Sequence, residues 1–147
     1  MNMKDSHSGS SVALLIGAAV LSADNVPTAV DLRGFRSAEI LLAIGAGGIT
    51  FSDTDKIEFV LTHSDDGETW DAVSDADVLG ASVASGGIIK ALTAAHAAAA
   101  AYRVGYVGGR RYLALLADFS GTHGTGTPIA AMLLEGDPTI APTADQA

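Results

Sequence analysis

The chain lacks cysteine and has few basic or aromatic residues, and each shortage excludes a class of site or partner. Without cysteine, the 147 residues form neither disulfides nor thiolate metal sites. Eight Lys and Arg stand against 17 Asp and Glu, which gives a formal net charge of −9. Nucleic-acid binding needs clustered basic residues, so we expect no nucleic-acid partner. With aromatics at only 5% and 17 glycines, the composition favours short strands and tight turns over long helices.

A membrane-spanning apolar run is missing as well. Val12–Leu21 is apolar throughout but is only about half the ~20 residues that a helix needs to cross a bilayer. A signal peptide is an alternative interpretation, with Lys4 before the run and Ser22 after it. Asp5 weakens the basic region that such a signal requires. We therefore expect Val12–Leu21 to be a buried first strand, with no association with a membrane.

What the chain does contain is a series of short apolar runs between turns rich in Gly, Asp and Pro. The clearest is Ile57–His63, where apolar and polar residues alternate, and the turn Asp65–Gly67 then returns the chain through Thr69–Val73. Further strands are predicted for Val12–Leu21, Thr28–Leu32, Ser37–Ile44, Gly87–Thr93 and Pro128–Leu134. This series predicts an all-β fold: a single-domain antiparallel β-sandwich of jelly-roll-like type, with less than about a tenth of its residues in helices.

The most informative stretch is Tyr102–Phe119, which predicts a hairpin with a tight turn at Gly108–Gly109. Counting outward from the turn places Gly105 opposite Tyr112, whose ring would cover the bare backbone. One face of the hairpin is then predicted to belong to the core: Tyr102, Val104, Tyr106, Arg111, Leu113, Leu115, Ala117 and Phe119.

The other face of this hairpin supplies the candidate partner-binding residues, which are Arg103, Arg110, Tyr112 and Leu116. This face mixes Arg and Tyr with aliphatic residues, as protein interfaces do. The alternative is that it packs on another strand, with the arginines left at its margin.

The sequence also indicates where the domain begins and ends. Residues 1–11 are polar and unpatterned and predict a flexible N-terminal arm, residues 12–136 form the β-sandwich domain, and residues 137–147 form an extended tail. Ala94–Ala101 is too short for a stable isolated helix despite its alanines, so it is either a helical turn or a loop.

No motif predicts catalysis, a cofactor or a metal site. Gly121–Pro128 has the glycines of a phosphate-binding loop but not its lysine. No two histidines have the spacing of a zinc site, and there is no nucleophile elbow. A calcium site is a weaker alternative, and it would use four aspartates: Asp53, Asp55, Asp65 and Asp66. We therefore expect a protein that is not an enzyme, with no catalytic, cofactor-binding or metal-binding residues.

Four motifs occur in an order typical of one kind of viral protein. They are DLRGF (residues 31–35), IEFVLTHSDDGETW (57–70), YRVGYVGGRRY (102–112) and ADFSGTHGTGTPIA (117–130). Together they resemble the small virion structural proteins of tailed bacteriophages and prophages, of the head decoration or capsid cement type. The resemblance covers residues 28–138 and implies no catalytic residues.

This resemblance implies a structural protein that decorates the outer surface of the capsid, binds the major capsid protein and stabilises its lattice. It also implies a homotrimer that is assembled in the host cytoplasm and located on the exterior of the virion. Two alternatives stay open. One is a tail or head-tail connector component, and the other is a carbohydrate-binding β-sandwich module that uses Trp70 or Tyr112 as a platform for a sugar.

Overall fold

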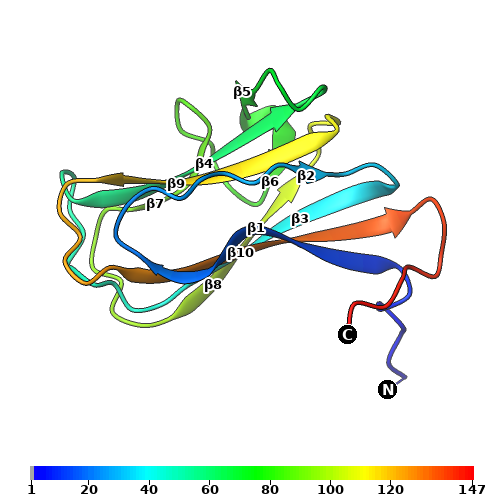
Figure 1. Cartoon of the computed structure of the whole chain (residues 1–147), viewed down its shortest axis with the longest axis horizontal. Coiled ribbons are helices and arrows are strands. Elements are labelled where there is room, and N and C mark those ends of the chain that lie inside the picture. The colour runs from blue at the N-terminus through cyan, green and yellow to red at the C-terminus, as the bar shows by residue number, and fades with distance from the viewer. Residues whose placement is uncertain (1) are drawn as a thin grey trace.

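Two antiparallel sheets face each other in the computed structural model, which describes residues 2–147 (Figure 1). Sheet A has five strands in the order β1 (Ser10–Leu21), β10 (Thr127–Pro138), β3 (Phe35–Ile44), β8 (Ala100–Tyr106) and β6 (Val78–Leu79). Sheet B has the order β2 (Val30–Asp31), β9 (Tyr112–Ser120), β4 (Lys56–Ser64) and β5 (Asp71–Ala72), and β7 (Ile88–Leu92) also pairs with β4. The predicted all-β sandwich is confirmed.

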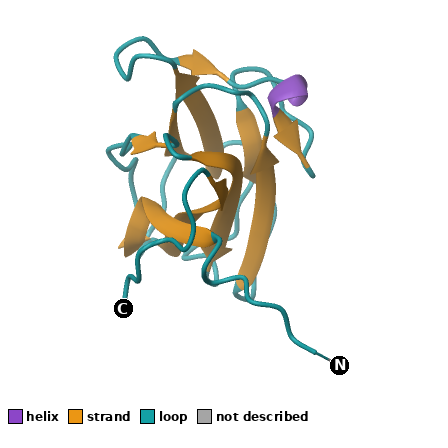
Figure 2. Cartoon of the chain, turned by 90° about the vertical axis from the view of Figure 1, so that its right-hand side faces the viewer, coloured by secondary structure: helices purple, strands orange, loops and turns teal. Residues whose placement is uncertain are grey.

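Helical structure is almost absent, as Figure 2 shows. Within residues 2–147, the single helical element is the 3-10 turn η1 (Asp75–Asp77), which Ser74 and Asp77 cap reciprocally. The alanine-rich segment is a loop that leads into β8 at Ala100. His96 holds this loop in place, because its two ring nitrogens lie 2.8 Å from the carbonyl oxygen of Gly45 and 3.0 Å from the hydroxyl of Tyr102.

The predicted hairpin Tyr102–Phe119 is wrong, because β8 belongs to sheet A and β9 to sheet B. The loop 107–111 crosses between the sheets. Its backbone hydrogen bonds go to other segments: Val107 N–H donates to Asp77, and the carbonyl of Arg111 accepts from Leu32. The ring of Tyr106 fills the space in front of Gly108, where a Cβ would come within 2.8 Å of it. The loop therefore wraps over this ring instead of turning back tightly, and the Gly105–Tyr112 pairing is also wrong.

The predicted core face is nevertheless largely correct. Val104, Tyr106, Leu113, Leu115 and Ala117 are buried between the sheets, because alternation sets the inner face of a strand whichever neighbour it pairs with. Arg111 is the error in this set. It lies in the loop before β9 starts and is exposed to solvent.

The expectation that Val12–Leu21 is buried is wrong in part. The segment is strand β1, but β1 is the outermost strand of sheet A, and only Leu15 and Ile16 are buried in it. Irregular pairing with β10 interrupts its register between Leu14 and Ala19. The large side chains that the strand places on its other face remain exposed.

Carboxamide side chains cover one edge of each sheet. On β9, Asn25 accepts a hydrogen bond from Ala117 N–H (2.7 Å) and donates to the carbonyl of Leu115 (3.2 Å). On β1, Gln146 binds both backbone groups of Val12 at 2.8 Å. Each amide replaces a missing neighbouring strand, which protects the edge from pairing with another chain.

The C-terminal segment 143–146 lies beside residues 7–12 at the start of β1. Thr143 N–H donates to the carbonyl of Ser8 at 2.9 Å, and its hydroxyl donates to the carbonyl of Ser10 at 2.7 Å. The imidazole of His7 lies 2.9 Å from the carboxylate of Asp145. In the single chain, the terminal segments therefore bind each other.

Candidate functional site

The four residues predicted to bind a partner do not share a face. Arg103 lies on the outer face of sheet A, 3.3 Å from the carboxylate of Glu39. Arg110 belongs to the loop between the sheets, while Tyr112 and Leu116 lie on the outer face of sheet B. The grouping depended on the hairpin and fails with it. A partner-binding role for the individual residues stays a prediction.

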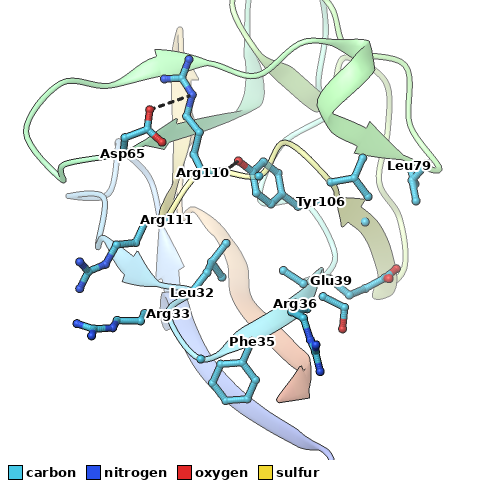
Figure 3. Close-up of a pocket in the computed structure, with 16 residues that line it drawn as sticks. Leu32, Arg33, Phe35, Arg36, Glu39, Asp65, Leu79, Tyr106, Arg110 and Arg111 are labelled. Carbon is cyan, nitrogen blue, oxygen red and sulfur yellow. Dashed lines mark hydrogen bonds and ion pairs between the residues drawn. The ribbon is translucent and has the colours of Figure 1, made fainter. Parts of the chain in front are cut away.

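Arg110 does line a cleft of about 670 Å³ at one end of the sandwich (Figure 3). The turn after β2 supplies Leu32 and the start of β3 supplies Phe35. The end of β8 and the loop that follows it supply Tyr106 and Val107. These side chains give the cleft an apolar lining. We call it the arginine cleft, because four of the eight basic residues of the chain line it: Arg33, Arg36, Arg110 and Arg111.

Most of these arginines are held by acidic neighbours. The guanidinium of Arg111 binds both carboxylate oxygens of Asp31, at 3.0 and 2.8 Å, and this hydrogen bonding lowers the pKa of Asp31 to about 2. Arg110 binds Asp71 and lies 3.9 Å from Asp65. Within residues 2–147, Arg33 makes no ion pair.

One of the residues that line the cleft, Tyr106, belongs to a buried polar pair with His63. The hydroxyl of Tyr106 lies 2.9 Å from Nδ1 of His63 and accepts a hydrogen bond from Arg110 N–H at 3.1 Å. Burial lowers the pKa of His63, and the nearby Arg110 lowers it further, so the imidazole is neutral near pH 7. The pair joins β8 of sheet A to β4 of sheet B and fixes the loop that carries Arg110.

A second surface, which the sequence did not reveal as an interface, is the outer face of sheet A. Its outward-facing rows are mostly apolar: Val12, Leu14, Val20, Leu41, Ala43, Ala101, Pro128, Ala130, Met132 and Leu134. Two charged side chains lie among them, Glu39 beside Leu134 and Arg103 beside Leu41, and they form an ion pair with each other. Leu14 is 57% and Val20 62% exposed. Contiguous exposed apolar patches mark interaction sites. The available signal was that Val12–Leu21 and Pro128–Leu134 are apolar on both faces.

The weaker chemical alternatives find little support in the geometry. Asp53 and Asp55 precede β4, whereas Asp65 and Asp66 follow it, so the full length of a nine-residue strand separates them. Asp66 instead caps its own turn by accepting hydrogen bonds from the N–H groups of Glu68 and Thr69, which lower its pKa to about 2. Residues 2–147 contain no group of three or more metal-ligating side chains.

One of the two rings considered as a sugar platform, that of Tyr112, is covered. The ring of Tyr112 lies under the guanidinium of Arg111, 4.9 Å from it, and against Gly67, so it is not a free platform. Over the described range 2–147, no helix is long and apolar enough to cross a bilayer.

The fold places the chain in the class of antiparallel β-sandwich proteins. A scan against protein-family models, a search of curated proteins and a search of solved structures each gave no match. Function is therefore inferred from the surfaces of the molecule and from the resemblance of its motifs.

Proposed function

We propose that this chain is a non-enzymatic structural protein of a tailed-bacteriophage virion, which decorates the outer surface of the capsid and stabilises its lattice. The order of the four sequence motifs favours this class of protein. Its partner is then the major capsid protein.

The observation that carries the proposal is the arginine cleft. It combines an apolar lining with a rim of arginines, three of which pair with carboxylates, and interfaces are enriched in Arg and aromatic residues around an apolar centre. Apart from Arg110, which is half-buried, the paired arginines of the rim are exposed, and exposed ion pairs contribute only about 0–1 kcal/mol each. They can therefore exchange partners at low cost when another subunit approaches.

The chemistry of the rim suggests what the capsid surface offers. Arg33 has no acidic neighbour in ion-pair distance within residues 2–147 and points away from the protein beside Arg111 (Figure 3). Val107 is 54% exposed at the same cleft. A complementary surface has an apolar side chain for the lining and a carboxylate or backbone carbonyl for the free guanidinium.

Co-sedimentation with capsids assembled without this protein tests the proposal. The wild type should pellet with them, and Val107→Glu and Arg33→Glu should each bind at least about tenfold more weakly, which corresponds to about 1.4 kcal/mol. Lys4→Glu is the matched control, because it makes the same charge change at an exposed residue in the N-terminal segment.

Three results would overturn this assignment. A wild type that stays in the supernatant and is retained on a glycan array would favour the carbohydrate-binding module. Localisation to the tail by electron microscopy would favour the tail or connector component. An equal loss of binding in Lys4→Glu would show that net charge or the terminal segment, and not the cleft, is responsible.

A further inference from the structure

The outer face of sheet A has two halves of opposite shape. At one end, four large side chains form a ridge: Val12, Leu14, Met132 and Leu134. At the other end is a hollow of about 600 Å³, where alanines from four strands and their flanking loops leave space, among them Ala18, Ala43, Ala100 and Ala130. The ridge and the hollow follow one another along β10.

We propose that a second copy of this chain packs on this face, with its ridge in the hollow of the first copy. The symmetry is a two-fold axis that lies in the interface, runs across the strands and passes between Ala130 and Met132. This rotation places Val12 and Leu134 of one copy over Val20 and Pro128 of the other. Because the contact is isologous, both hollows are filled at once.

Charge favours a second copy at this face over other faces. Each chain has a formal net charge of −9, so two copies repel each other over most of their surfaces. The charged side chains in the outward-facing rows of β10, β3 and β8 are Glu39, beside Leu134, and Arg103, beside Leu41; they pair with each other at 3.3 Å, so this face is neutral overall. Approach through this face therefore separates the repelling charges by the thickness of two sandwiches.

The available area is sufficient for a dimer but not for a very stable one. Four strands spaced about 4.8 Å apart and roughly eight residues long cover on the order of 500 Å² per copy. The total of roughly 1,000 Å² lies at the lower limit for specific protein interfaces. We expect a dissociation constant on the order of 10 μM, and tighter association at high salt, where the repulsion is screened.

Sedimentation velocity over a concentration series tests the inference. The wild type should change from monomer to dimer, and Leu14→Glu should remain a monomer. Val107→Glu is the matched control, because Val107 is 54% exposed against 57% for Leu14 but lies at the arginine cleft. It should dimerise like the wild type. A wild type that stays monomeric to about 1 mM, a trimer, or a Leu14→Glu variant that still dimerises would overturn the inference.

Cysteine cross-linking tests the orientation, since the chain has no cysteine of its own. Chains with Val12→Cys and chains with Val20→Cys, mixed and treated with a short bismaleimide, should link to each other more than either links to itself. Strong linking of Val12→Cys alone would place ridge against ridge and overturn the proposed axis.

These measurements use the isolated protein, so they do not depend on capsid binding. Dimerisation without capsid binding would support this inference and contradict the proposed function. Capsid binding by a strictly monomeric protein would support the proposed function and contradict this inference.

Discussion

The two sheets are alike on their inner faces and different on their outer faces. On the inside, every second side chain of the main strands is aliphatic or aromatic and packs in a core that the two sheets share. Outside, sheet B has mixed pairs such as Glu58 beside Asp118 and Val60 beside Leu116, the latter two half-buried. The outer face of sheet A instead exposes Leu14, Val20 and their apolar neighbours.

This difference shows how an apolar run should be interpreted in a sandwich. Ile57–His63 in sheet B alternates, so its pattern already separates an inner from an outer face. Val12–Leu21 and Pro128–Leu134 do not alternate, and such runs are typical of strands covered on both faces. A sandwich of two layers covers only one face of each strand. A run without alternation therefore predicts an exposed face that another subunit can cover.

The largest expected effect is the difference in unfolding free energy between alanine variants of two neighbouring leucines of β10. Leu133 is fully buried on the inner face, whereas Leu134 is 37% exposed on the outer face. Leu133→Ala should lower the free energy of unfolding by about 2–5 kcal/mol, because it leaves a cavity. Leu134→Ala should cost less than about 1 kcal/mol in the monomer. Urea unfolding at low protein concentration measures both, and equal losses would mean that the outer face is covered within the chain itself.

The second effect concerns the contact that joins the sheets. Tyr106→Phe removes the hydroxyl that binds His63 and Arg110 N–H, so buried polar groups lose their partner. We expect a loss of about 1–3 kcal/mol in unfolding free energy. Tyr102→Phe is the control, because its hydroxyl binds His96 in a half-buried position and its loss should cost less. If the two variants unfold alike, the buried pair has no special part in joining the sheets.

The sequence predicted the strands and their inner faces better than it predicted their partners. Alternation is local, so β4 and the core positions of β8 and β9 were recognisable from the residues alone. Pairing is not local: Gly108 and Gly109 permit a tight hairpin, but the ring of Tyr106 occupies the space in front of Gly108 and the loop crosses to the other sheet. The local sequence pattern does not show that the ring of Tyr106 and a tight turn at Gly108 compete for the same space. Strand β6 has only two residues, which are too few to show a periodic pattern, so it could not be recognised from the sequence.

The candidate site was only partly predictable. Arg and Tyr were singled out as interface-type residues, which stays a prediction, and their grouping followed the wrong hairpin. Arg33 and Arg111 approach each other at the arginine cleft because the turn after β2 lies beside the loop before β9, which depends on pairing between distant segments. The apolar face of sheet A was not recognised because Val12–Leu21 was expected to be buried on both faces.

A third and smaller effect compares the amides that cover the two sheet edges. Asn25 is half-buried and binds the backbone of two residues of β9, whereas Gln146 is exposed and binds the backbone of Val12 alone, with a longer hydrogen bond of 3.3 Å from the hydroxyl of Ser11. Asn25→Ala should therefore cost about 1 kcal/mol, and Gln146→Ala a few tenths of that, about 0.3 kcal/mol. Hydrogen exchange provides a local measurement. The amide of Ala117 should exchange faster in the first variant only, and the amide of Val12 in the second only.

The smallest expected effect is on the pH dependence of folding stability, and it involves one buried titratable group from each sheet. Burial raises the pKa of Glu135 on β10 above its ordinary value of 4.5, and the carboxylate of Asp31 raises it further. The folded protein then keeps a proton that the unfolded chain releases, so stability falls as the pH rises from about 4.5 through the raised pKa. His63 on β4 has the opposite sign. Its pKa is lowered from 6.5, so stability falls as the pH drops below that value.

Glu135→Gln separates the two contributions, because glutamine keeps the size of the side chain and cannot ionise. The variant should unfold at a higher temperature than the wild type at pH 8, where the wild type must either hold a proton or bury a charge. At pH 4 the two proteins should unfold at nearly the same temperature, since both side chains are then neutral. The loss of folding stability below pH 6.5 should remain in the variant, because His63 is unchanged. A variant equally stabilised at pH 4 and pH 8 would show that the gain comes from packing or hydrogen bonding, and that the inner face of sheet A holds no costly charge.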